Sequence, residues 1–199
     1  MSVTATEALD VLSSRLASER FANGFGGFST AQCATEPTCF ALLALRDKLR
    51  KDAHDHHLRA LMSYQRPDGF WPAVDRDSGP GVWATAVAVN TLIELSPGNR
   101  ALRSGIKALL GAKPQEALWL YRLKFRTIDT RVRFDPSKYG WGWVPGTVSW
   151  VIPTAMALIA LERSRRLEPC CREGTRAQTR SRVRDAVGSD VPRRRLERR

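Results

Sequence analysis

The sequence predicts an all-α protein built from stacked helical units, because one pattern occurs three times along the chain. Each occurrence is a turn of glycine and aromatic residues, then a short spacer, then an apolar stretch with a threonine near its start. These threonines, Thr38, Thr85 and Thr154, are 47 and 69 residues apart. Spacings of this size are typical of helical units that stack and share one core.

The first predicted element is a helix near the N-terminus. Thr4 and Glu7 have the spacing of a capping box, in which each side chain satisfies a backbone N–H at the start of a helix. We expect this helix to bury Leu9, Leu12 and Leu16.

The three apolar stretches are predicted to be inner helices. Pro37 and Pro153 suit the first turn of a helix, where no amide donor is needed. The stretches that follow are apolar nearly all round, which indicates helices that are buried on every side.

Amphipathic segments between the inner helices are predicted to form an outer layer. One covers 57–64 and another covers 100–110, with Gly111 as its stop signal. A further helix is expected from Pro114 to about Thr127. The inward residues of the two outer helices are Leu58, Leu61, Met62, Leu102, Ile106, Leu109 and Leu110.

The charge divides the chain into two predicted regions, a repeat domain (1–161) and an Arg-rich tail (162–199). The whole chain has a net charge of +12, and the tail contributes +7 of it with 13 arginines and no lysine. The tail has too few apolar residues to offset its ordering entropy, so we expect disorder. It is either an arm for an anionic partner or a stretch without selected structure, including a changed reading frame. The second interpretation is favoured, so no specific nucleic-acid partner is predicted.

Several classes of protein are disfavoured by what the sequence lacks. No apolar run reaches the roughly 18 residues of a membrane-spanning helix, and no secretory signal is evident. We therefore expect a cytoplasmic protein, with peripheral membrane association as an alternative. No CxxC pair is present, and His54, His56 and His57 are interpreted as a solvated helix end. No metal and no cofactor are predicted.

Two segments resemble a known family. Residues 65–71, Gln-Arg-Pro-Asp-Gly-Phe-Trp, are similar to the Gln–Gly–Trp repeat element of squalene–hopene cyclases, in which Gln and Trp tie outer helices together. Residues 143–154 resemble a stretch common in prenyltransferase/squalene oxidase repeat proteins. The likeness to the terpenoid cyclase and protein prenyltransferase superfamily covers about residues 1–161. It implies an α/α-toroid with inner and outer helices, here an incomplete ring. A homodimer or another partner would then complete the ring.

The resemblance implies a relation to isoprenoid metabolism but no independent catalysis. Cyclases of this family protonate an alkene with an Asp-x-Asp-Asp-Thr-Ala motif, and the matching segment here, 81–86, carries no acid. Protonating an alkene needs a strong, desolvated acid, which Trp and Ala do not supply. The Asp-Asp-x-x-Asp motif that holds magnesium and diphosphate is also absent. No catalytic residue is predicted, and enzyme activity of the cyclase or prenyltransferase class stays open.

Loops before the inner helices face the central cavity in that family, so aromatic residues there are candidates for lining an isoprenoid or lipid pocket. The alternative for each is a structural role, in helix packing, turn formation or helix capping. The alternative function is a non-catalytic repeat module that binds a lipid or a protein partner. The candidate pocket residues are Trp71, Trp83, Trp141, Trp143, Trp150, Asp75, Asp77 and Glu36.

Overall fold

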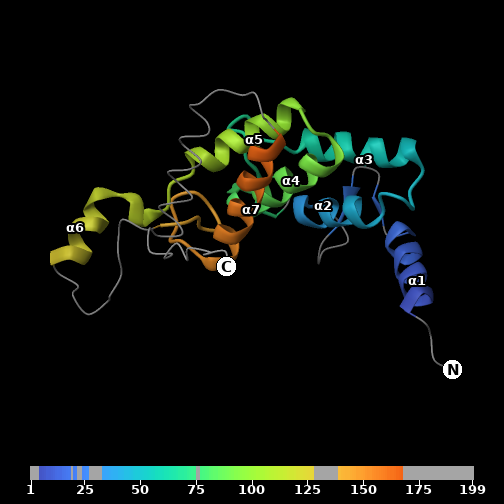
Figure 1. The fold of residues 1–199 in the computed structure, drawn as a ribbon, viewed down its shortest axis with the longest axis horizontal. Coiled ribbons are helices and arrows are strands. Elements are labelled where there is room, and N and C mark those ends of the chain that lie inside the picture. Colours follow the sequence, from blue (N-terminus) through green and yellow to red (C-terminus); the bar gives the residue numbers. More distant parts are fainter. Residues whose placement is uncertain are drawn as a thin grey trace, which may run out of the picture.

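A computed structural model describes residues 5–18, 20–21, 24–26, 33–74, 77–127 and 139–167. Most of these residues are helical, which confirms the all-α prediction (Figure 1). None of the described helices is both long and apolar enough to cross a membrane. The helices are α1 (Ala5–Ser18), α2 (Thr35–Ala44), α3 (Lys51–Ser63), α4 (Val82–Leu95), α5 (Arg100–Gly111), η1 (Gln115–Ala117, a 3-10 turn), α6 (Trp119–Thr127) and α7 (Val151–Leu167).

The helices form a row with a second layer behind it. Helix α4 lies in the middle of the row, with α2 on one side and α7 on the other (Figure 1). Helix α5 packs against α4, and α3 packs against α2, so α3 and α5 form the second layer. Helices α1 and α6 extend at opposite ends of the long axis. Closure into a ring stays a prediction.

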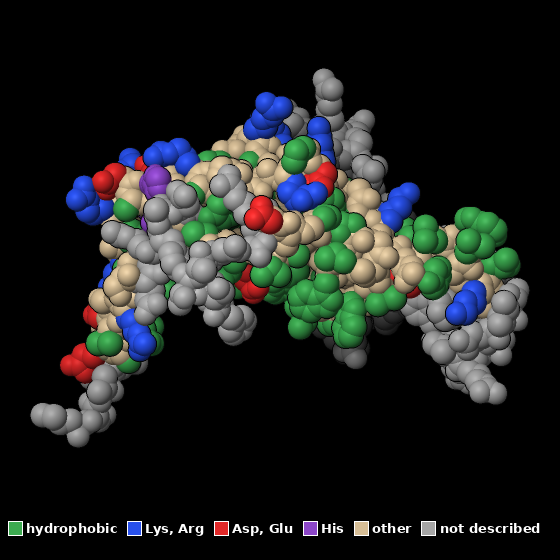
Figure 2. Space-filling model, turned by 180° about the vertical axis from the view of Figure 1, so that it is seen from behind, with side chains coloured by type: hydrophobic (Ala, Val, Ile, Leu, Met, Phe, Trp, Pro, Cys, Tyr) green, Lys and Arg blue, Asp and Glu red, His purple; other side chains and the backbone are tan. Residues whose placement is uncertain are grey.

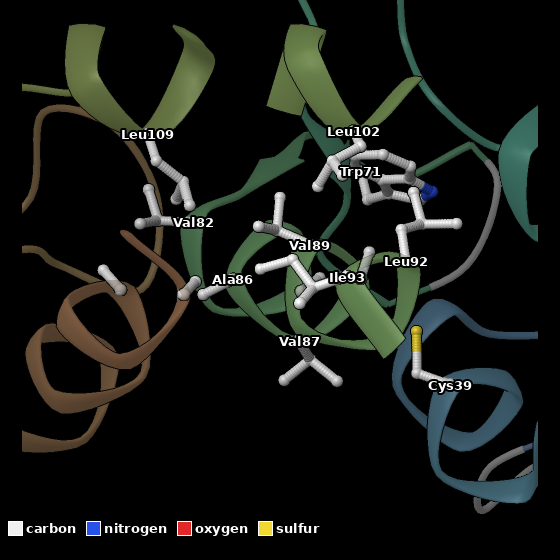
Figure 3. Packing of buried hydrophobic residues seen from close by; sticks show 14 of the residues in the cluster. Cys39, Trp71, Val82, Ala86, Val87, Val89, Leu92, Ile93, Leu102 and Leu109 are labelled. Carbon is white, nitrogen blue, oxygen red and sulfur yellow. The ribbon is translucent and has the colours of Figure 1, made fainter. Parts of the chain in front are cut away.

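Helix α4 is the centre of the hydrophobic core. Its side chains are buried on nearly every side because it contacts α2, α5 and α7 (Figure 3). Small residues such as Ala84 and Ala88 alternate with Val89 and Leu92, so the neighbouring helices can approach closely. The expectation of burial all round is therefore right for α4. It is wrong for α7, whose Ile159 is 49% exposed, because α7 ends the described row.

Each inner helix is tied to the turn before it by a hydrogen bond that we call a clasp. In a clasp, the amide of an aromatic residue in the turn donates to the hydroxyl of a threonine in the helix. The aromatic residue precedes its threonine by 13 or 14 residues. The three clasps are Phe25 to Thr38 at 3.0 Å, Trp71 to Thr85 at 2.9 Å and Trp141 to Thr154 at 2.9 Å.

Two of these aromatic residues also tie the turn to an outer helix. The indole Nε1 of Trp71 donates to Leu61 O at 2.8 Å, and that of Trp141 donates to Leu109 O at 2.9 Å. Leu61 and Leu109 are each the third-last residue of their helices, α3 and α5, where carbonyls lack a partner within the helix. One tryptophan therefore makes both ties: its indole N–H donates to the end of the outer helix, and its backbone amide donates to the threonine of the next inner helix.

Two-residue strand pairs complete the first two turns. Strand β1 (Arg20–Phe21) pairs antiparallel with β2 (Gly24–Phe25), and β3 (Trp71–Pro72) pairs with β4 (Pro80–Gly81). A Cβ on Gly81 would lie 2.6 Å from the Cα of Ala73, so the close approach of this hairpin requires glycine.

The N-terminal helix corrects one prediction. Leu9 and Leu12 are 64% and 62% exposed, so the predicted inward face of α1 is not buried. Near its C-terminal end, Ala17 packs against a small cluster of Phe25, Ala41 and Leu45, and in its middle Asp10 pairs with Lys48 Nζ at 2.6 Å. Thr4 of the expected capping box lies outside the described residues.

The two predicted outer helices are present, with small differences at their ends. The predicted tail boundary falls inside a helix. Helix α3 begins at Lys51, ahead of the expected 57, and α5 covers the expected residues. Helix α7 continues through Leu167, so the boundary predicted after Leu161 falls inside a helix. Residues 168–199 lie outside the described residues.

Candidate functional site

The structure separates the five candidate tryptophans into two groups. Trp71 and Trp141 lie in the core, 0% and 1% exposed, and their indole N–H groups donate to backbone carbonyls of the outer helices. Trp83 and Trp143 are in ring contact at the start of α4, and Trp150 lies directly before α7 in the loop that also carries Trp143. We call these three residues the tryptophan surface.

Ring contact and exposure define the tryptophan surface. The ring centroids of Trp83 and Trp143 are 5.7 Å apart with an interplanar angle of 57°, a tilted arrangement that aromatic pairs favour. Trp83 is half-buried, whereas Trp143 and Trp150 are 41% and 56% exposed. The aromatic faces are therefore accessible while the pair keeps a fixed geometry.

Backbone hydrogen bonds hold the tryptophan surface in place. Val82 N donates to Trp143 O at 2.9 Å, which joins the loop to the first residue of α4. Trp150 N donates to Trp141 O at 3.0 Å, which folds the loop back on itself. Gly142 lies inside this loop, where a Cβ would be 2.7 Å from Val148 O, so no larger residue fits without a shift.

A buried carboxylate that sequence reasoning missed supports the same loop. Glu116, in the η1 turn, is 7% exposed, and its Oε1 accepts from the amide of Ser149 at 2.7 Å. Its Oε2 has no hydrogen-bond partner within the described part of the chain. Glu116 is therefore a positioning residue for the segment that carries Trp150. The sequence gives no motif around it that would have singled it out.

Aliphatic side chains extend the tryptophan surface. Val148 is 43% exposed, Val151 84% and Ile152 54%. Hydrophobic side chains gather on the face of the molecule drawn in Figure 2. Large exposed apolar patches are uncommon on monomeric proteins and mark sites of interaction.

The two candidate carboxylates that the structure describes, Glu36 and Asp77, lie on other elements than the tryptophan surface. Glu36 is half-buried in the first turn of α2, and Asp77 is exposed in the turn between β3 and β4. Asp75 lies outside the described residues. Neither α4 nor α7 has an acidic residue in its first turn. The surface thus offers aromatic and aliphatic contacts but no proton donor at these helix starts.

Cys39 and His57 are buried and act in packing. Burial raises the pKa of Cys39 to about 12; a hydrogen bond with Thr91 lowers it less, and the charge of Glu36 raises it further. Cys39 is therefore a thiol, not a nucleophile, at neutral pH. The expected solvated helix end is wrong for His57, which is 3% exposed with its ring 5.3 Å from that of Phe25. The described residues contain no group of three or more ligands arranged to hold a metal.

An open groove with a mixed polar and apolar lining contains none of the candidate residues. It has a volume of about 490 Å³ and is open to solvent, between α5, the turn at 68–70 and Pro145. None of the candidate tryptophans or carboxylates lines it. Its lining is Asp68, Phe70, Ser104, Lys107, Ala108, Gly111, Ala112, Lys113 and Pro145.

No protein-family model and no curated protein matches this chain. Inferences about its function therefore depend on the tryptophan surface and on the repeated clasps.

Proposed function

We propose that this chain is a helical repeat protein of the terpenoid cyclase and prenyltransferase type that binds an isoprenoid or another lipid. The ligand lies on the tryptophan surface, and the protein does not protonate it. The observation that carries the proposal is the ring contact of Trp83 with the exposed Trp143, together with the exposed Trp150 in the same loop and the exposed aliphatic residues next to it.

The repeated architecture supports the family part of the proposal. Three clasps occur at matching positions before three inner helices. Gln65 Nε2 donates to Gly69 O at 3.0 Å and to Ala101 O at 2.9 Å, which ties the end of α3 to the start of α5. Gln65 and Trp71 thus join outer helices, which is the role that the resemblance implies for the Gln–Gly–Trp element.

The chemistry of the surface supports an apolar ligand. Tryptophan presents a large, rigid apolar face with one polar N–H, a combination that suits the boundary between a lipid and water. An isoprenoid chain offers methyl-rich apolar area and no charge that would need a partner. Because no acid occupies the first turn of α4 or α7, binding without alkene protonation is the expected behaviour.

The test compares binding by the wild-type protein with a double variant, Trp143→Ala with Trp150→Ala. Equilibrium dialysis with farnesol and flotation with phosphatidylcholine vesicles distinguish a single lipid ligand from a membrane surface. Each tryptophan face buried by a ligand is worth about 1.5–3 kcal/mol, so the double variant should bind at least about tenfold more weakly.

Trp119→Ala is the matched control, because Trp119 is 69% exposed on α6 and is not one of the three residues of the tryptophan surface. It should leave binding unchanged. Absence of saturable binding by the wild-type protein, or equal loss in the control, would contradict the proposal. Incubation with squalene should give no product, and turnover would contradict the non-catalytic part.

A further inference from the structure

The outward face of α7 is the place where the repeated packing stops. Ile152, Ala155 and Ile159 follow one another at intervals of three and four residues, so they share one face of the helix. All three are exposed. This face continues the apolar area of Val151 along the side of α7.

The repeat itself identifies what covers such a face. Aligned on the clasp threonines, Ala155 of α7 corresponds to Ala86 of α4 and to Cys39 of α2. Cys39 is fully buried and belongs to the core cluster built around α4, and Ala86 is fully buried next to α7 (Figure 3). Each earlier inner helix is therefore covered at this position by the following inner helix. The described residues provide no helix to cover Ala155.

The opposite end of the row is partly covered, although Phe40 of α2 is 46% exposed. The outward side of α2 carries Ala41 and Leu45, which are 2% and 0% exposed, because Phe25 packs on them with Ala17 and Leu49 alongside. A head-to-tail partner would need an open face at both ends. Within the described row, Ala41 and Leu45 are already covered, whereas Ile152, Ala155 and Ile159 form an exposed apolar face on α7, so a partner that uses this same face on both copies fits better.

The distribution of charge along α7 sets the orientation of that partner. The first half of the helix is uncharged, and the second half carries Glu162, Arg163, Arg165 and Arg166. Parallel pairing of two α7 helices would place their arginines side by side. Antiparallel pairing opposes the two apolar halves, sets Ile152 opposite Ile159 of the partner copy, and separates the arginines at the two ends. Ala155 at the centre allows close approach of the helices.

We propose that two copies of this chain pair through this face, with their α7 helices antiparallel about a twofold axis near Ala155. The proposal does not depend on ligand binding at the tryptophan surface. A second copy is favoured as the occupant because the sequence of residues 168–199 offers few apolar residues that could match Ile152 and Ile159.

The experiment measures the mass of the full chain by sedimentation velocity over a range of concentrations. Wild-type protein should pass from monomer to dimer as the concentration rises. Ile159→Glu should weaken dimerisation by about tenfold or more, because it places two carboxylates in an apolar contact. Ile152→Glu should do the same, and it should not harm folding because a carboxylate in the first turn of a helix is favourable.

Val74→Glu is the matched control, since Val74 is an aliphatic residue that is 65% exposed in a turn away from α7. Circular dichroism checks that all variants remain folded. A wild-type monomer at every concentration would overturn the proposal. So would an equal loss in the Val74 control, or dimerisation that survives Ile159→Glu and Ile152→Glu but is lost in Trp143→Ala.

Disulfide formation tests the orientation in a background with Cys33, Cys170 and Cys171 changed to serine. Ala155→Cys should cross-link rapidly between copies, because Ala155 lies near the proposed axis. Arg166→Cys should not, because antiparallel pairing places the two residues far apart. Equal cross-linking by both variants would overturn the antiparallel arrangement.

Discussion

Helices α4 and α7 begin in the same way but have different surroundings. Each follows a tryptophan whose amide donates to a threonine in the helix and whose indole donates to the end of an outer helix. Helix α4 is then covered by α2, α5 and α7, whereas α7 is covered mainly by α4. The comparison teaches that each unit forms its own tryptophan hydrogen bonds, whereas the burial of its helix depends on the helices that pack against it.

The sequences of the two helices reflect this difference. Helix α4 has a single charged residue, Glu94, close to its end. Glu94 contacts Arg46 at 2.8 Å and Arg163 at 2.9 Å, so it is placed between the flanking units. Helix α7 has four charged residues in its last six positions, which suits an exposed helix end.

The largest expected effect separates the two buried tryptophans. Trp71→Ala should lower the free energy of unfolding by about 3–5 kcal/mol, because it leaves a large cavity in the core and removes a buried hydrogen bond. Trp141→Ala should cost less, since the α7 unit has fewer neighbours to lose. Urea unfolding followed by circular dichroism measures both values.

Trp119→Ala is the control for this pair and should change the free energy of unfolding by less than about 0.5 kcal/mol, as expected for an exposed side chain. An equal cost for Trp71→Ala and Trp141→Ala would break the distinction between the central and the terminal unit.

A smaller effect should come from the clasp threonines. Thr85 is fully buried, so Thr85→Val leaves the amide of Trp71 without an acceptor and should cost about 1–3 kcal/mol. Thr154 is half-buried, so water can replace its hydroxyl, and Thr154→Val should cost about 1 kcal/mol. Thermal and urea unfolding compare the two. A larger cost at Thr154 would contradict the idea that burial increases toward α4.

The smallest effect is expected at the exposed end of α7. Hydrogen bonding to Arg165 lowers the pKa of Glu162 to about 2; desolvation opposes this, and the charges of Arg165 and Arg166 lower the pKa further. A lowered pKa stabilises the fold above the ordinary pKa of glutamate, and this contribution is lost as the pH falls toward 2. Because the pair is exposed, Glu162→Gln should cost less than about 0.5 kcal/mol at pH 7.

The measurement for Glu162→Gln is a pair of urea unfolding curves at pH 7 and pH 3. The difference between wild type and variant should shrink at the lower pH, where much of the glutamate in the unfolded chain is protonated. If the difference in the free energy of unfolding grew as the pH falls, the contact with Arg165 would not be the cause of the lowered pKa of Glu162.

The sequence predicted the repeated units because their signals are local. A threonine, a glycine-aromatic turn and an apolar stretch recur in the same order, and Thr38, Thr85 and Thr154 all form the same contact. The amphipathic spacing also placed Leu61 and Leu109 correctly in the core.

The local sequence could not predict which tryptophans are buried and which are exposed. Trp141 and Trp143 belong to one Gly-Trp-Gly-Trp segment, yet one is buried and the other is exposed. The difference arises because the C-terminal end of α5 lies within reach of the indole N–H of Trp141. Contacts between distant elements also decide the burial of Glu116 and the exposure of Leu9. Such contacts leave no signal in the local sequence.

The clasps have a consequence for the way the chain reaches this structure. Each one closes a loop of only 13 or 14 residues, and closing so short a loop costs little chain entropy. Contacts that are close in sequence form early and favour fast folding. Each turn can therefore be joined to its helix before the units pack together. The order of assembly then depends on which unit packs against α4 first.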